Sequence, residues 1–233
     1  ATPDCGCAPP PQKDFMVGWW PLDSDGTDIR GGHSGTVTGG TFQPAVVQNG
    51  WKPSPTGSTI SVPDQNDLDV VSFSVDAWVI INALNNPNMP IVWKGSPTGA
   101  NLMGSYGLSV GGTSEQHPGK LLAVISDGVN HLELPSTINL PIGVPVHVAA
   151  IGEFTASTGM TNLCLYINGV KNDCKAANFQ IQNTTDPFNI GGGAGQFSFN
   201  GIIDEVELWK AALTPEEIED IYQAGSAGKC RSS

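Results

Sequence analysis

Hydrophobic and polar residues alternate along many short stretches of the chain, which is the pattern of β-strands that bury one face. The clearest stretch is 73–81, FSVDAWVII, where every second side chain is apolar and Trp78 lies on the opposite face. Gly, Pro and Asn residues separate such stretches, as expected for turns between antiparallel strands. The pattern predicts further strands at residues 15–23, 58–62, 90–93, 106–110, 121–126, 144–151, 163–167 and 188–190.

Another strand is predicted at the start of residues 199–225, FNGIIDEVELWKAALTPEEIEDIYQAG. Regular alternation would place one set of side chains on one face: Ile203, Glu205 and Glu207. The opposite face would then hold Ile202, Asp204, Val206 and Leu208. One face of this strand is therefore expected to be mixed and partly acidic.

A short helix is predicted after this strand, near Pro215 to Ala224. Thr214 offers a hydroxyl N-cap, and Glu217 completes a capping box. Pro215 suits the first helical position, where no amide donor is needed. An apolar stripe at helical spacing and the following Gly225 complete the pattern of a short amphipathic helix.

These elements predict an all-β fold, a sandwich of two antiparallel sheets with one short C-terminal helix. The 233 residues include 29 Gly and 18 Pro, which agrees with a fold rich in turns. A sandwich of this length commonly forms one unit, so we expect a single domain at 15–233. Residues 1–14 carry four prolines and two cysteines with almost no apolar side chains, and they are predicted to be a tether.

Five segments, in order, carry a family resemblance. The closing segment matches at Gly201, Ile203, Asp204, Glu205, Val206, Leu213, Thr214, Glu217 and Ile218. The opening segment matches at Trp20, Pro21, Leu22, Asp23, Asp28, Gly32, Gly35, Thr36 and Val37. The strand at 73–79, the strand at 147–149 and the hairpin at 165–169 match between them. Together they resemble the laminin-G-like domains of the concanavalin A-like lectin/glucanase superfamily, which implies a jelly roll over roughly residues 15–225.

Charge narrows the range of partners. The chain has 22 acidic and 10 basic residues, a formal net charge of −12, so binding to nucleic acid is not expected. No run approaches the roughly 20 apolar residues that cross a bilayer, so membrane insertion is not expected either. Neutral ligands or cations suit this composition better.

The five cysteines form no zinc-type pair of pairs, so disulfides in an oxidising compartment are expected. That use favours secretion or a cell-surface location. Cys164 and Cys174 flank a hairpin whose turn is Asn168-Gly169, and a two-residue turn would place Cys164 opposite Asp173. A bridge from Cys164 to Cys174 therefore needs one extra loop residue or a bulge, and we favour that bridge because the other cysteines lie near the termini.

In the implied jelly roll the first and last strands lie side by side. Either Cys5 or Cys7 is therefore expected to bridge Cys230. The remaining thiol would be available for self-association.

The resemblance also implies a structural Ca²⁺ between the first loop and the closing strand. Asp28 and Asp204 are the expected side-chain ligands, with Asp23 third and a carbonyl from Gly32, because Ca²⁺ prefers oxygen ligands. Arg30 would oppose the cation unless it points away. The alternative is that these are ordinary turn and capping aspartates.

For a ligand site, Trp93 and Tyr106 are aromatic residues near strand ends, with Lys94 and Asn101 in the adjoining loop. The alternative for each is a place in the core. The favoured function is an extracellular non-catalytic binding module for carbohydrate or for a protein surface. The alternative is a structural subunit of a surface or filamentous assembly, and a glycoside hydrolase is third.

Catalysis has weak support in the sequence. Glucanases of this superfamily carry Glu-x-Asp-x-(x)-Glu on one strand, and 204–207, DEVE, lacks the first glutamate. Glu205 and Glu207 are expected on a solvated edge, and His147 in the core. The chain is therefore predicted not to be an enzyme.

Overall fold

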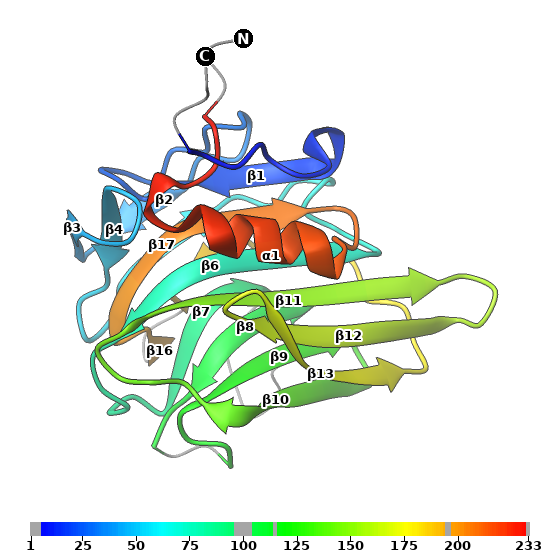
Figure 1. The fold of residues 1–233 in the computed structure, drawn as a ribbon. Coiled ribbons are helices and arrows are strands. Elements are labelled where there is room, and N and C mark those ends of the chain that lie inside the picture. Colours follow the sequence, from blue (N-terminus) through cyan, green and yellow to red (C-terminus); the bar gives the residue numbers. More distant parts are fainter. Residues whose placement is uncertain (1–5, 96–103, 114–115, 194–196, 232–233) are drawn as a thin grey trace, which may run out of the picture.

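The computed structural model describes residues 6–95, 104–113, 116–193 and 197–231. Two antiparallel sheets stack face to face, and one short helix lies across the outer face of one of them (Figure 1). The predicted all-β sandwich with a C-terminal helix is confirmed.

The first sheet contains eight strands, among them the first and the last strand of the chain. Its order is β13 (Val170–Ala177), β12 (Met160–Ile167), β11 (Pro145–Thr155), β6 (Phe73–Ile81), β17 (Gly201–Trp209), β4 (Asn49–Lys52) and β3 (Thr41–Pro44), and β1 (Met16–Trp20) also pairs with β17. The first and last strands therefore lie side by side, as the resemblance implied.

The second sheet covers the other side of the core. Its order is β10 (His131–Asn139), β9 (Lys120–Ser126), β8 (Tyr106–Gly111), β7 (Asn88–Lys94), β14 (Phe188–Ile190), β5 (Thr59–Val62) and β2 (Thr36–Thr38). A small ribbon is formed by β15 (Gly192–Gly193) and β16 (Phe197–Ser198).

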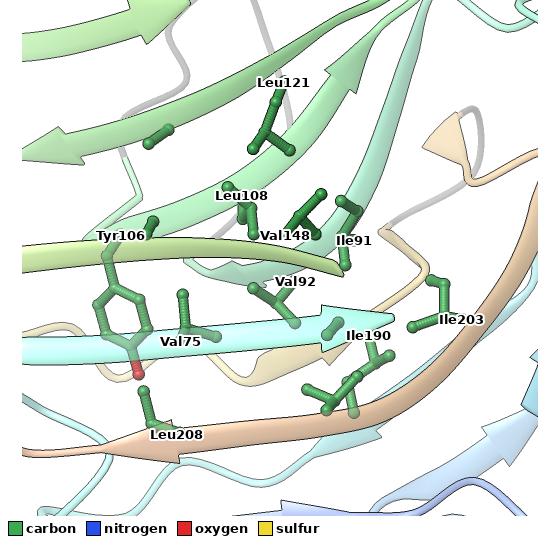
Figure 2. Close-up of a cluster of buried hydrophobic side chains, with 14 of the residues drawn as sticks. Val75, Ile91, Val92, Tyr106, Leu108, Leu121, Val148, Ile190, Ile203 and Leu208 are labelled. Carbon is green, nitrogen blue, oxygen red and sulfur yellow. The ribbon is translucent and has the colours of Figure 1, made fainter. Parts of the chain in front are cut away.

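The main core fills the space between the two sheets. Val75, Val148 and Leu208 from the first sheet pack with side chains of the second sheet (Figure 2). Each of these three side chains is at most 1% exposed. The alternation predicted for residues 73–81 is confirmed, because Val75 and Val79 belong to this core whereas Trp78 lies outside it.

A second, smaller core lies on the outer face of the first sheet. Helix α1 (Pro215–Ala224) has the predicted capping box, in which Thr214 accepts from the Glu217 amide and Glu217 accepts from the Thr214 amide. The helix buries Ile218 and Ile221 against Trp19 and Trp209 of the sheet. Two 3₁₀ turns complete the set of helical elements among the described residues: η1 (Lys13–Phe15) directly precedes β1, and η2 (Gly225–Ala227) directly follows α1.

A bulge in β17 changes which side chains share a face. Glu205 adopts a left-handed backbone conformation with φ 51°, and the pairing with β6 shifts between Asp204 and Glu207. Ile203 and Val206 therefore both face the main core. The predicted regular alternation is wrong, because the extra residue at the bulge gathers the acidic side chains on the outer face.

The described part of the predicted tether is packed against the domain. Ala8 pairs with Lys229 in a parallel bridge, and a disulfide joins Cys7 to Cys230. The carbonyl of Pro11 accepts a hydrogen bond from the Trp209 indole at 3.0 Å. Residues 7–14 thus form part of the outer layer instead of extending away as a linker.

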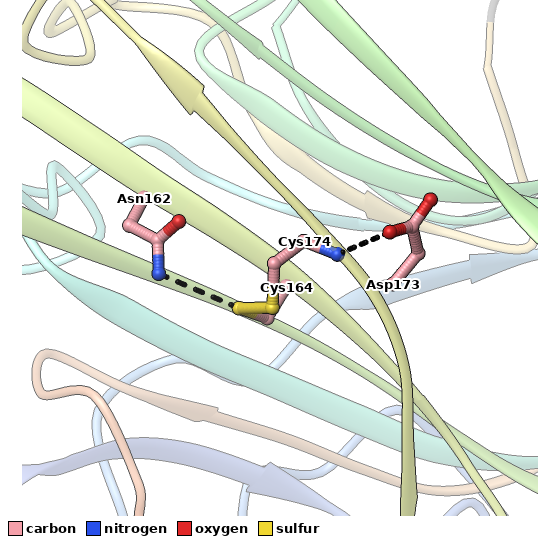
Figure 3. The surroundings of a disulfide bond; sticks show 4 residues. All are labelled: Asn162, Cys164, Asp173 and Cys174. Carbon is pink, nitrogen blue, oxygen red and sulfur yellow. Dashed lines mark hydrogen bonds between the residues drawn. A yellow bond between two sulfur atoms is a disulfide. The ribbon is translucent and has the colours of Figure 1, made fainter.

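The second disulfide joins Cys164 to Cys174 across the β12–β13 hairpin (Figure 3). The two cysteines are direct cross-strand partners, and a register shift between Leu165 and Tyr166 supplies the bulge that the bridge requires. Both expected pairings are therefore confirmed, with Cys7 as the partner of Cys230. Cys5 lies outside the described residues.

The two disulfides differ most in the length of chain that they close. Cys7 and Cys230 are 223 residues apart, whereas Cys164 and Cys174 are 10 apart. In the chain-entropy account the longer loop constrains the unfolded state more, by about 5 kcal/mol against about 3 kcal/mol. We expect Cys7→Ser with Cys230→Ser to lower the melting temperature more than Cys164→Ser with Cys174→Ser. Calorimetry on both double variants checks this, and an equal or smaller loss for the terminal bridge would contradict it.

Asp204 is the buried acid with the clearest pH consequence. Burial raises its pKa to about 8, against hydrogen bonds from the Val47 and Val46 amides that oppose the rise and with the charge of Glu205 adding to it. Between about pH 4 and pH 8 the folded chain holds a proton that the unfolded chain has released. The free energy of unfolding therefore falls as pH rises through this window, by at most about 1.4 kcal/mol per pH unit.

We expect Asp204→Asn to remove this dependence. The amide oxygen can still accept from Val46 and Val47, whose N–H groups lie 3.0 and 2.8 Å from Oδ2. The variant should gain stability over the unmutated protein at pH 8 and little at pH 5, measured by urea unfolding. Asp220→Asn, at an exposed helix position, is the control and should leave the pH profile unchanged. A wild-type profile that is flat from pH 5 to pH 8 would refute the assignment.

Candidate functional site

A C-terminal strap, residues 229–231, crosses the outer face of β17 and neutralises its acids. Lys229 Nζ lies 2.7 Å from Glu207 Oε1, and both side chains are at most 3% exposed. Arg231 bridges two carboxylates, with Nη1 at 2.5 Å from Asp23 and Nη2 at 2.7 Å from Glu205. The strap thus joins the first loop and the closing strand through two cations.

A buried titratable cluster lies beneath the strap. Asp76 accepts from His147 Nε2 at 2.8 Å, and Glu207 is its cross-strand neighbour. Burial raises the pKa of Glu207 well above its usual value, and the nearby Asp76 carboxylate adds to the rise while Lys229 opposes it. Burial opposes the charged form of Lys229, but the Glu207, Asp76 and Glu205 carboxylates outweigh it and raise the pKa of that amine.

The two acids that the sequence offered for catalysis, Glu205 and Glu207, belong to this buried, paired region. Glu205 and Glu207 are 1% and 0% exposed, so the expected solvated edge is wrong. Glu205 accepts from the Trp19 indole at 2.8 Å and from Arg231, and Glu207 pairs with Lys229. Both carboxylates therefore have structural partners. His147 is buried and paired with Asp76, which agrees with its expected core role.

An open pocket lies beside the strap, and we call it the terminal pocket. It has a volume of about 320 Å³ and is lined by Pro10, Lys13, Met16, Trp19, Ile29, Arg30 and Arg231. The lining comes from the N-terminal segment, β1, the loop after β1 and the strap. Met16 and Trp19 are nearly fully buried and belong to the second core, which makes that part of the wall rigid.

The terminal pocket combines apolar and cationic side chains. Ile29 is 44% exposed and provides an aliphatic wall. Lys13, Arg30 and Arg231 provide N–H donors, which suit hydroxyl and carboxylate acceptors. A concave, partly apolar site with a few polar groups is the usual form of a small-molecule site.

The ligand residues expected from the sequence do not form such a site. Trp93 and Tyr106 are 2% and 1% exposed, and Tyr106 Oη donates to the Leu68 carbonyl at 2.9 Å. Lys94 is fully buried, with Nζ 2.6 Å from Asp64 Oδ1. Trp93 and Tyr106 are large aromatic side chains that fill space in the interior. Lys94 can be buried because its charge is paired with Asp64, and this pair anchors a loop. Asn101 lies outside the described residues.

Sequence analysis missed the terminal pocket for a physical reason. Its cations, Lys13, Arg30 and Arg231, come from three segments that contacts distant in sequence bring together, among them the terminal disulfide and the hydrogen bond from Arg30 to the Lys13 carbonyl. The one available signal was Arg30 in the first loop, at a position expected to be small and polar.

The donors expected for Ca²⁺ are already engaged. Both oxygens of Asp28 accept from backbone amides, including those of Trp19 at 2.9 Å and His33 at 3.1 Å. Asp23 is paired with Arg231, and the Gly32 carbonyl accepts from a glutamine side chain at 2.9 Å. Asp204 has one oxygen, Oδ1, that has no hydrogen-bond partner among the described residues. One available carboxylate oxygen does not fit an ion that needs six to eight ligands.

The described part of the chain also contains no group of three or more His, Cys, Asp or Glu side chains able to hold a metal. The guanidinium of Arg231 instead supplies positive charge between Asp23 and Glu205. These four expected ligands act as turn, capping and ion-pair groups.

We therefore expect melting curves in chelator and in millimolar Ca²⁺ to superimpose. A native-state metal site would raise the melting temperature in calcium, since binding to the folded state adds to its stability. Differential scanning calorimetry measures the effect directly. A rise in calcium that Asp204→Asn abolishes would show that the donor set does hold an ion.

Comparison with solved structures finds several similar folds. Domain 4 of the extracellular arabinanase AbnA from Geobacillus stearothermophilus, in complex with arabinotriose, has a TM-score of 0.69 at 19% identity, covering 88% of this chain and 97% of that one. The binding domain of Paraclostridial Mosquitocidal Protein 1 has a TM-score of 0.66 at 16% identity, covering 90% of this chain and 52% of that one. Trypanosoma rangeli sialidase has a TM-score of 0.64 at 17% identity, covering 91% of this chain and 33% of that one.

The chain thus spans nearly all of the arabinanase domain, about half of the mosquitocidal binding domain and a third of the sialidase. At these identities the likeness shows the fold alone. No curated protein sequence gives a significant match.

Family assignment comes from a sequence model. The laminin-G model described as the concanavalin A-like lectin/glucanases superfamily matches residues 54–219, which is most of the chain. It covers strands of both sheets and the start of α1. The chain therefore belongs to the concanavalin A-like lectin/glucanase superfamily.

Proposed function

We propose that the chain is an extracellular, non-catalytic carbohydrate-binding module and that the terminal pocket is its ligand site. The observation that carries the proposal is the pocket's make-up. The exposed side chain of Ile29 offers apolar surface, and Lys13, Arg30 and Arg231 offer donors to sugar oxygens. Sugars present both kinds of surface, because ring C–H groups pack on apolar walls and hydroxyls accept hydrogen bonds.

The size of the pocket suits a short oligosaccharide. Small-molecule sites span about 300–1,000 Å³, and the terminal pocket, at about 320 Å³, lies at the lower end. It therefore suits one or two sugar units with the remainder of a glycan in solvent. The arabinanase domain of the same fold is described in complex with arabinotriose, which supports a sugar ligand here by analogy of fold.

An extracellular location is supported by the two disulfides, which persist in oxidising compartments. No helix within the described ranges has the length and hydropathy to span a bilayer.

The non-catalytic assignment is supported by Glu205 and Glu207, which are buried and engaged in ion pairs.

The alternative of a structural subunit linked through cysteine gains no support. Cys7, Cys164, Cys174 and Cys230 pair within the chain. A protein partner in place of a sugar would need a broader surface than the terminal pocket offers. We therefore keep the carbohydrate-binding proposal.

A glycan array followed by calorimetric titration tests the proposal. We expect a monomer that retains a defined oligosaccharide, and Ile29→Ala to weaken binding several-fold because it removes apolar wall without changing charge. Val129→Ala is the control, since Val129 is 80% exposed and does not line the pocket.

Two outcomes would overturn the proposal. One is the absence of binding to any glycan on the array. The other is release of reducing sugar from the retained glycan, which would make the chain an enzyme.

A further inference from the structure

The terminal pocket is unusual in charge for this protein. Among the described residues that line it, three of seven are cationic and none is acidic, although the chain has 22 acidic and only 10 basic residues. The other four described pockets each have at least one carboxylate in the lining, such as Asp220, Asp25, Glu153 or Asp69. A local concentration of cations against a strongly negative background needs an explanation.

The three cations differ in how far they are already neutralised. Arg231 pairs with Asp23 and Glu205, and its side chain is 32% exposed. Within the described residues, no ion pair joins Lys13 or Arg30 to a carboxylate, and both residues are exposed. Two positive charges at the pocket therefore lack an internal counter-charge.

Two acids of the first loop, Asp28 and Asp23, are directed elsewhere. Asp28 is buried, and its oxygens accept from the amides of Trp19, Arg30 and His33. Asp23 is held by Arg231 and by the amide of Asn49. Neither is among the described residues that line the terminal pocket.

The Arg30 side chain and the backbone at Lys13 are also held in place by the fold. The Arg30 amide donates to Asp28 Oδ1 at 2.8 Å, and Nη2 of its guanidinium donates to the Lys13 carbonyl at 2.9 Å. The residue before Lys13 is anchored in turn, because Gln12 Nε2 donates to Glu217 Oε2 at 2.8 Å. Such positioning reduces the entropy lost when a ligand binds.

We propose that the terminal pocket selects an acidic sugar, with an anionic group seated at Lys13 and Arg30. This deepens the proposed function and rests on it. A guanidinium presents a planar fork of donors that matches a carboxylate or a sulfate, and an ammonium adds a compact charge. Arg231, already balanced by two carboxylates, forms the far wall and donates to sugar hydroxyls.

The experiment compares matched ligands that differ only in the charged group. The probes are trigalacturonic acid, a hyaluronan tetrasaccharide and sialyllactose, each beside its carboxyl-reduced form and a sulfated derivative of that form. We expect at least one acidic probe to bind tenfold or more tightly than its neutral counterpart, since charge-assisted hydrogen bonds stabilise a complex by about that factor. The preference should decrease as salt increases, because Lys13 and Arg30 are exposed.

Variants locate the effect. Lys13→Ala with Arg30→Ala should remove the preference for acid, because it should weaken the binding of acidic probes tenfold or more beyond any loss for their neutral counterparts. Lys171→Ala is the matched control, because Lys171 is exposed and lines a different pocket. Arg231 is left unchanged, since its removal would leave the buried Glu205 without a partner cation.

The outcomes separate this inference from the proposed function. Binding of neutral probes without any acid preference, or a preference that survives the double variant, overturns the acidic-sugar inference alone. Failure of every probe and of the glycan array overturns both. The carboxylated and sulfated arms identify which anionic group is preferred.

Discussion

The pairing of Lys229 with Glu207 is the interaction on which the outer layer of this protein depends. A buried carboxylate without a partner would be costly, so the acid on β17 requires a cation at this position. The chain supplies it from the C-terminal strap, which the disulfide from Cys7 to Cys230 holds beside the N-terminal segment. The same disulfide therefore positions two parts of the terminal pocket's lining, the N-terminal segment and the strap.

The bulge at Glu205 is the reason that β17 requires cations from the strap. A regular strand would divide the acids between the core and the outer face, and an acid in the core would lack any cation. With one extra residue, Ile203 and Val206 both face the main core and the acids gather outside. The left-handed conformation of Glu205 is thus accompanied by two ion pairs to buried carboxylates, with Lys229 as the partner of Glu207 and Arg231 as the partner of Glu205.

Much of the fold could be predicted from local patterns, whereas the site could not. The helix from Pro215 to Ala224 carries its own caps, and strand β6 alternates without interruption. Strand β10 was missed because Pro135 breaks the pattern, which an edge strand tolerates. The bulge at Glu205 and the burial of Lys94 depend on contacts distant in sequence, so neither alternation nor residue type indicated them.

If the terminal pocket is the ligand site, ligands bind beside Trp19 and not beside Trp93. An indole N–H spectrum of ¹⁵N-labelled protein, assigned through Trp19→Phe, tests this directly during titration with the oligosaccharide found by screening. The Trp19 indole donates to Glu205 next to the pocket, whereas the Trp93 indole is buried in the second sheet. We expect the Trp19 signal to shift while that of Trp93 stays unchanged. A shift at Trp93 alone would contradict it.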